Sequence, residues 1–192
     1  NNVQLRKERL VVARSVLVSE VTASDERLYA TVSMEVLHGA ADGFSLEIPA
    51  GFQITSAASA RMTQWAIRKD GDRQLLDIDL RETIQGTEVL QITATRTPAR
   101  LSNWTMPKVV PQNVAGHVAV IGLLAEVRLK PIQLQTSRLI PLDHEILMGA
   151  LPADMAKPQP GAPPIRPLAV YYAPTEDYQW SAELQKPPVK LQ

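Results

Sequence analysis

Apolar and polar residues alternate along several segments of the first half of the chain. In residues 28–36 the even positions hold Leu, Ala, Val, Met and Val, and the odd positions hold Tyr, Thr, Ser and Glu. A period of two is typical of a β-strand with one face in a core and the other in solvent. The same alternation marks residues 44–48, 76–80 and 90–94. We therefore predict four half-buried strands in these segments.

Residues that favour chain reversal separate these segments. Asp-Gly at 70–71 and Gln-Gly at 85–86 each supply a glycine for a positive φ, and Pro-Ala-Gly at 49–51 divides two strands. These sequences predict antiparallel hairpins at all three positions.

Three more strands complete the first half, and the first of them follows the Pro-Ala-Gly corner at Phe52 and Ile54. The other two are predicted over 8–21 and over 63–68, with Trp65 and Ile67 turned inward. The first half then holds about seven strands between residues 5 and 97, the number expected of a small β-sandwich.

Proline divides the chain. There are 15 prolines, and only Pro49 precedes residue 98. Because proline fixes φ and donates no N–H, the backbone of the second half is more restricted and has fewer hydrogen-bond donors. We place a boundary near residues 97–111, which predicts a β-sandwich domain over 1–97 and a second β-rich domain over 98–192.

The second half also favours strands. Residues 142–147 alone suit a short helix, because Asp143 is favourable in a first turn. The predicted fold class is all-β, with two antiparallel β-sandwich-like domains and very little helix. The remaining predicted elements are two strands within 114–130, a proline-rich loop over 152–167, and strands at 168–172 and 178–184 joined by a hairpin loop over 173–177.

Composition and charge narrow the choice of partners and compartment. Twenty Lys and Arg balance twenty Asp and Glu, and no segment has the positive excess that nucleic acid or an anionic membrane surface would need. We expect no nucleic-acid partner and no direct membrane insertion by this segment. The chain has no cysteine, which favours an extracytoplasmic location, the periplasm or the cell surface. Since it begins with Asn1, we expect a fragment of a longer protein.

No motif for catalysis, metal binding or cofactor binding is found. His38, His117 and His144 lie far apart, and we see no support for a Ser–His pair. Asp143-His144-Glu145 is interpreted as a surface salt-bridge group. Asp70, Asp72, Asp77 and Asp79 are interpreted as turn and strand-surface residues that meet Lys or Arg across strands, rather than as a calcium loop. We predict no catalytic residue, no metal site and no cofactor, and therefore no enzyme.

Aromatic residues gather near the C-terminus. Tyr172, Tyr178 and Trp180 share strand faces with aliphatic residues and are predicted to lie in the core. Tyr171 alone should face outward, where its ring could stack on a ligand. A carbohydrate- or peptide-binding module is therefore the alternative function, and a hydrolase whose site is completed by other domains is a third.

Several features follow one another in the first half: the strand and Pro-Ala-Gly corner of 44–54, Trp65, the Asp-Gly turn, and the strands at 76–80 and 90–92. This succession resembles β-sandwich ectodomain modules of large uncharacterised bacterial cell-envelope proteins. The resemblance continues through 116–120, 168–172 and 178–184. It implies an envelope-associated scaffold and no active residue. The predicted function is a non-catalytic structural or interaction module, whose partners are neighbouring domains of the same chain or another envelope protein.

Overall fold

The structure consists almost entirely of strands. The computed structural model describes residues 9–151, 160–161 and 163–187, and 68% of these residues are strand and 4% helix. The all-β prediction is therefore confirmed. In chain order the strands are β1 (Leu10–Val21), β2 (Glu26–Ile48), β3 (Gln53–Ala58), β4 (Met62–Asp70), β5 (Arg73–Arg96), β6 (Trp104–Thr105), β7 (Val110–Pro111), β8 (Gly116–Glu126), β9 (Lys130–Ser137), β10 (Ile140–Pro141), β11 (Ile165–Ala173) and β12 (Gln179–Gln185), and helix α1 spans His144–Ala150.

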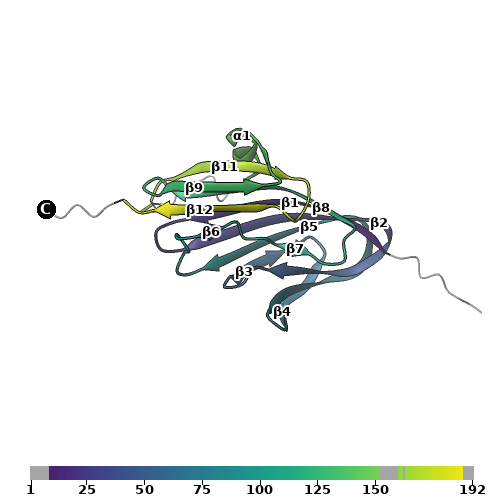
Figure 1. Cartoon of the computed structure of the whole chain (residues 1–192). Helices are drawn as coiled ribbons and strands as arrows, with labels where there is room; N and C mark the ends of the chain where they lie inside the picture. The colour runs from purple at the N-terminus through teal and green to yellow at the C-terminus, as the bar shows by residue number, and fades with distance from the viewer. Residues whose placement is uncertain (1–8, 152–159, 162, 188–192) are drawn as a thin grey trace, which may run out of the picture.

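The strands form two sheets that enclose one main core. The larger sheet has nine strands in the order β10-β11-β8-β1-β2-β5-β3, with β4 paired to β5 and β7 paired to β2, and the smaller sheet is β6-β12-β9. Figure 1 shows the smaller sheet lying over part of the larger one. Trp104 and Trp180 of the smaller sheet belong to the same buried cluster as Leu28 and Val32 of the larger sheet. The sheets therefore pack face to face, as in a sandwich.

One strand pair joins the two halves of the sequence. β1 and β8 run parallel, with Val12 opposite Gly116 and Val21 opposite Ala125. The prediction of purely antiparallel sheets is wrong at this pair. Because β1 lies before residue 97 and β8 after it, the two halves share one sheet and one core.

Two long strands replace four predicted short ones. Segments 28–36 and 44–48 both belong to β2, and segments 76–80 and 90–94 both belong to β5. The turn predicted at 85–86 is wrong: Gly86 has φ +86° but stays inside β5, where β2 and β5 change register. A glycine in a strand can mark a bend rather than a reversal. The Asp-Gly turn between β4 and β5 is confirmed, with Gly71 at φ +62°.

A single strand also replaces the two predicted within 114–130. β8 passes straight through Gly122, and the absent side chain makes room for helix α1. A Cβ built on Gly122 would lie 2.5 Å from Cδ1 of Leu147, which is completely buried in the small cluster between α1 and the sheet. The short helix predicted near 142–147 is confirmed. No helix among the described residues is long and apolar enough to cross a membrane.

The segment between β11 and β12 connects the two sheets. β11 pairs with β8 and β10 in the larger sheet, and β12 pairs with β6 and β9 in the smaller one. The hairpin predicted over 173–177 is therefore wrong. β11 also begins at Ile165, within the proline-rich loop predicted over 152–167; residues 152–159 and 162 of that loop lie outside the described residues.

A buried carboxylate ties four strands together beneath the smaller sheet. The side chain of Glu26 in β2 has no exposed surface and is ion-paired with Arg96 of β5. Its Oε2 accepts hydrogen bonds from Ser19 Oγ of β1 at 2.9 Å and from Trp104 Nε1 of β6 at 2.8 Å. A buried charge needs such partners, because removal from water is costly.

Candidate functional site

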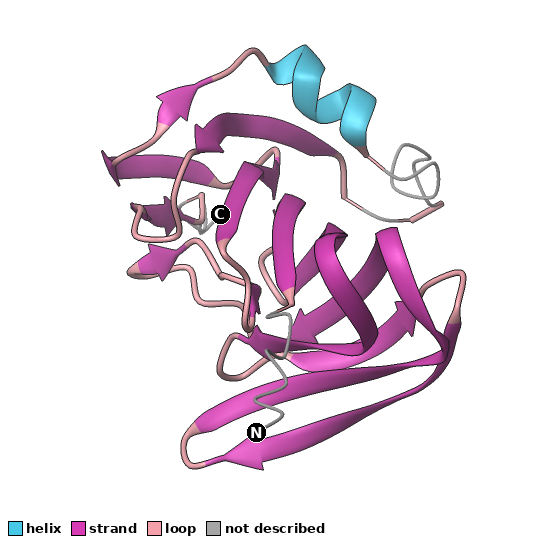
Figure 2. Cartoon of the chain, turned by 90° about the vertical axis from the view of Figure 1, so that its right-hand side faces the viewer, coloured by secondary structure: helices cyan, strands magenta, loops and turns pink. Residues whose placement is uncertain are grey.

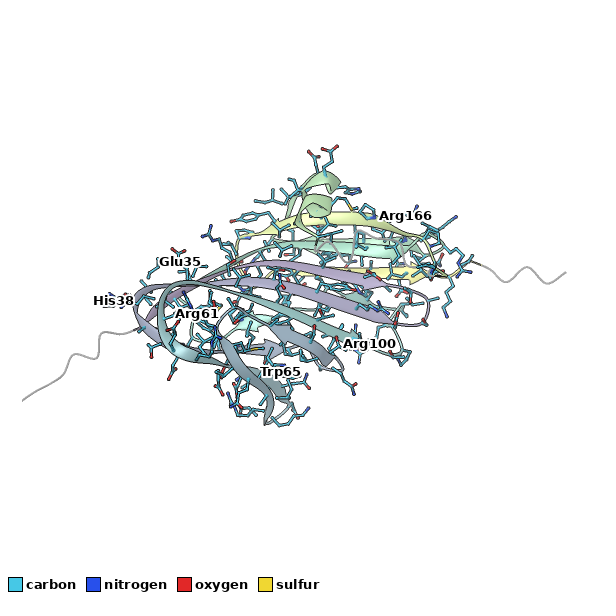
Figure 3. The ribbon with its side chains drawn as sticks, turned by 180° about the vertical axis from the view of Figure 1, so that it is seen from behind. Glu35, His38, Arg61, Trp65, Arg100 and Arg166 are labelled. Atoms are coloured by element: carbon cyan, nitrogen blue, oxygen red, sulfur yellow. The ribbon has the colours of Figure 1, made fainter. Side chains whose placement is uncertain are left out.

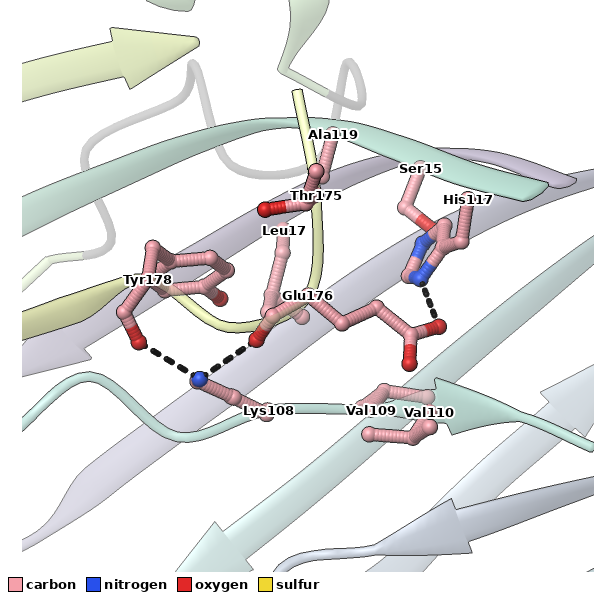
Figure 4. Close-up of a pocket in the computed structure, with 10 residues that line it drawn as sticks. All are labelled: Ser15, Leu17, Lys108, Val109, Val110, His117, Ala119, Thr175, Glu176 and Tyr178. Carbon is pink, nitrogen blue, oxygen red and sulfur yellow. Dashed lines mark hydrogen bonds and ion pairs between the residues drawn. The ribbon is translucent and has the colours of Figure 1, made fainter. Parts of the chain in front are cut away.

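Ser15, His117 and Glu176 form a hydrogen-bonded array where the two sheets meet. Ser15 Oγ lies 2.6 Å from Nε2 of His117, and Nδ1 of the same ring lies 2.8 Å from Oε1 of Glu176. Ser15 and His117 stand on the inward faces of β1 and β8, and Glu176 stands on the connection between β11 and β12 (Figure 4). The order serine, imidazole, carboxylate is that of a catalytic triad.

Lys108 also binds the connection between β11 and β12. Its Nζ donates hydrogen bonds to the backbone carbonyls of Glu176 at 2.7 Å and Tyr178 at 2.6 Å, and it lies 4.1 Å from the centre of the Tyr178 ring. Burial lowers the pKa of Lys108, while the nearby charge of Glu176 acts in the opposite direction. Burial also raises the pKa of the Tyr178 hydroxyl. The connection is thus fixed to both the imidazole and the ammonium.

The array has no room for a substrate. Ser15 is 7% exposed, and the cavity among the lining side chains holds roughly one water molecule. Ser15 also lies in the middle of a strand that is paired on both sides, with β2 and with β8. Its neighbouring N–H groups therefore serve the sheet and cannot form an oxyanion hole. The arrangement therefore suits a structural role better than that of a nucleophile: the imidazole joins β1 and β8 to the connection that carries Glu176. We call this set of contacts the latch.

We expect His117→Ala to loosen the connection between the sheets. The substitution leaves the Ser15 hydroxyl and the Glu176 carboxylate without their imidazole partner, which should cost about 1–2 kcal/mol. Amide hydrogen exchange at residues 174–178 should become faster, while exchange in β1 and β2 stays slow. His38→Ala, at an exposed position in β2, is the matched control. Equal exchange in the two variants would contradict the latch.

Sequence reasoning missed this array because its members are far apart along the chain. Ser15 and His117 are separated by 102 positions and His117 and Glu176 by 59. The prediction that no Ser–His pair exists is therefore wrong, because Ser15 and His117 are in hydrogen-bond contact. Their shared inward face could have been read from the alternation in 8–21 and 114–130, but the parallel pairing that brings those segments together could not.

The other polar groups singled out in the sequence lie on the surface. Asp77 is ion-paired with Arg68 across β4 and β5 at 2.8 Å, so the expected cross-strand cation is confirmed, and the hydrogen bond from that guanidinium lowers the pKa of Asp77. His144 is exposed at the start of α1 and makes no ion pair with the described residues. Its predicted salt-bridge role is therefore wrong within the described part of the chain.

Tyr171 faces the core rather than solvent. It is 9% exposed, and its ring packs edge to face against Trp180 with a centroid distance of 4.8 Å. The outward orientation predicted for it is wrong. A register shift between β11 and β8 at Pro167 and Ala169 breaks the simple alternation, since an irregularity moves the following side chains to the other face. In this structure the ring offers no free face for stacking.

The face of the larger sheet that points away from the main core is only partly covered. α1 packs on it over Val18 and Leu124, but the part formed by β1, β2, β5 and β8 has no covering element among the described residues. We call this part the outer face. It contains Val12, Val16, Val118 and Val120, which are partly exposed, and the more exposed Leu10, Leu37 and Val89.

Comparison with known proteins gives matches in fold. No protein-family model and no curated protein matches the sequence. The M1 zinc metallopeptidase from Deinococcus radiodurans superposes with a TM-score of 0.52 at 10% identity, over 92% of this chain and 43% of the metallopeptidase. A mutant of that metallopeptidase gives a TM-score of 0.56 at the same identity and coverage. Yeast LTA4 hydrolase in complex with Bestatin gives 0.52 at 12% identity, over 95% of this chain and 30% of the hydrolase.

These matches establish a shared fold. The matched region in those proteins is an N-terminal β-sandwich domain, which is a non-catalytic part of a larger enzyme. This chain spans less than half the length of each of them. The β-sandwich part of the sequence resemblance is confirmed, and these neighbours are not cell-envelope ectodomains.

Zinc, named for the metallopeptidase, does not fit the described residues of this chain. No group of three or more His, Cys, Asp or Glu side chains gathers among them. Helix α1 begins with His144-Glu145, the first two residues of the zinc motif His-Glu-x-x-His, but Met148 stands at the last position. No step of a zinc-dependent reaction can be assigned to these residues.

Proposed function

We propose that this chain is a non-catalytic structural module of a larger protein and packs against a neighbouring domain. The observation that carries the proposal is the fold match, which takes in 92% of this chain but only 43% of the first metallopeptidase. In that protein the same fold is one part of a longer chain. A module of this kind needs a surface that remains apolar after its own core is complete.

The outer face provides such a surface. Leu10, Leu37 and Val89 are 40%, 54% and 42% exposed, and they share one side of the sheet with the partly exposed valines of β1 and β8. The charges on this face occur in opposite-sign pairs: Arg14 lies 3.5 Å from Glu35, and Glu20 stands opposite Arg27. On β2 and β5 the face also carries polar side chains, among them Thr31, Ser33, Gln91 and Thr93. The apolar residues of this nearly neutral face suit the apolar side of another domain, and burying them would be favourable at about 25 cal/mol per Å².

An extracytoplasmic location for the larger protein is a separate proposal. It is supported by the absence of cysteine, and the fold neighbours give it no support.

Hydroxyl-radical footprinting tests the proposed surface directly. The side chains of Leu37 and Val89 should be labelled less in the longer natural protein than in this chain alone. Ile146, which is 46% exposed on α1, should be labelled equally in both. Equal labelling of Leu37 and Val89 in the two forms would rule out the outer face as the docking surface.

A paired substitution extends the test. Leu37→Asp with Val89→Asp should leave the melting temperature of the isolated chain nearly unchanged, because exposed positions contribute little to its stability. The same pair should lower the melting temperature of the longer protein, because two charges would be buried between domains. The control is Ile146→Asp, which should lower neither.

A further inference from the structure

Strand β4 forms an unpaired edge that carries apolar side chains. Among the described residues β4 pairs only with β5, and the β4–β5 hairpin projects from the body of the molecule (Figure 2). Trp65 lies opposite Ile78 and Ile67 lies opposite Leu76. Paired residues point to the same side of a sheet, so Trp65 and Ile67 extend the core face, as the sequence predicted.

These two side chains lack a complete cover. Trp65 is 37% exposed and Ile67 is 39% exposed, whereas Ile78 and Leu76 beside them are 1% and 0% exposed. Figure 3 shows Trp65 on the projecting hairpin. The two side chains therefore lie on the predicted face of the sheet. They are not buried there, although the prediction expected burial. Exposed edge strands usually carry a charge or a proline near the centre, and the central sequence here is Trp-Ala-Ile.

We propose that β4 pairs with β4 of a second copy of this chain, antiparallel and with the two-fold axis at Ala66. In this register Trp65 lies opposite Ile67 of the partner subunit, and Ile67 lies opposite Trp65 of the partner subunit. The four side chains form one apolar cluster on the core side of the joined sheet. The proposal is independent of the outer face and goes beyond the function proposed above.

The hydrogen-bonding pattern of β4 permits this register and excludes one shifted by a single residue. Asp70 and Arg73 close the two-residue turn, and the closing pair of such a hairpin is hydrogen-bonded. Bonded and non-bonded pairs then alternate along the strand, so Trp65 and Ile67 direct their own N–H and C=O groups to the free edge. With the axis at Ala66, these groups meet one another in complementary pairs. A shift by one residue would place them opposite groups already used by β5.

The charges of β4 also fit a second copy. Arg68 lies opposite Gln64 of the partner subunit, and Lys69 lies opposite Thr63 of the partner subunit, so no like charges meet. Arg68 is already bound to Asp77, which neutralises its charge. Self-complementarity of this kind is what a two-fold interface requires.

A single cysteine tests the register, because the chain has none of its own. Ala66 pairs with itself at a non-bonded position of the proposed dimer, where Cα atoms approach to about 4.5 Å and a disulfide can form. Ala66→Cys should therefore oxidise to a covalent dimer at low protein concentration. Asp72→Cys, which is also exposed and lies at the tip of the same hairpin, should not. Equal cross-linking of the two variants would overturn the register.

Sedimentation equilibrium of the unmodified chain supplies the independent measurement. We expect reversible dimers that are lost in Ile67→Lys, which places a charge against Trp65 of the partner subunit, while the circular dichroism spectrum stays that of the original chain. A chain that remains monomeric at all concentrations, without cross-linking of Ala66→Cys, would overturn the proposal. Because these experiments use this chain alone, their failure would leave the outer-face proposal standing.

Discussion

Replacing Glu26 with Gln is expected to lower the free energy of unfolding by about 3–5 kcal/mol, the cost of breaking a buried ion pair from one side. The amide cannot neutralise Arg96, whose side chain is only 13% exposed. It would also be a weaker hydrogen-bond acceptor for Ser19 and Trp104, both of which donate to the carboxylate. Urea denaturation followed by circular dichroism measures the change.

The matched control is Glu35→Gln in the same strand. Glu35 is paired with Arg14 on the surface, where the side chains are 34% and 70% exposed. Such pairs contribute about 1 kcal/mol or less. If both variants lost the same free energy of unfolding, the buried network would contribute no more to stability than the surface ion pair. The double variant Glu26→Gln with Arg96→Met should recover part of the loss, because it removes the uncompensated charge.

Replacing Trp104 with Phe should cost about 1.5–3 kcal/mol more than replacing Trp180 with Phe. The two indoles are completely or almost completely buried and pack edge to face at 5.3 Å, so both substitutions lose similar volume, and only Trp180 also loses a contact with Tyr171. Only Trp104 donates Nε1–H to a carboxylate, and hydrogen bonds to charged groups contribute most. Nε1 of Trp180 has no hydrogen-bond partner among the described residues.

Thermal and urea unfolding of both variants separate packing from hydrogen bonding. The Trp180→Phe value measures the lost ring area, and the difference between the variants measures the hydrogen bond. A larger loss in Trp180→Phe would show that the packing of β12 matters more than the Glu26 network. Near-ultraviolet circular dichroism would confirm that the remaining indole keeps its environment in each case.

Local sequence patterns predicted the elements whose side chains follow a simple period. The alternation in 28–36 and 178–184 correctly identified the buried residues of β2 and β12, because a strand with one buried face needs apolar residues at every second position. Asp143 correctly marked the beginning of the only helix in the described part of the chain. Glycine was less informative, since Gly71 turns the chain while Gly86 only bends a strand.

The sequence by itself determined that this chain is all-β, where most strands lie and which faces they bury, because these properties depend on residues close together along the chain. Only the tertiary structure decided the parallel pairing of β1 with β8, and with it the meeting of Ser15, His117 and Glu176. Strand partners are chosen by the packing of the whole core, and no local period records them. The inward turn of Tyr171 belongs to the same class, because one register shift against β8 reverses its face.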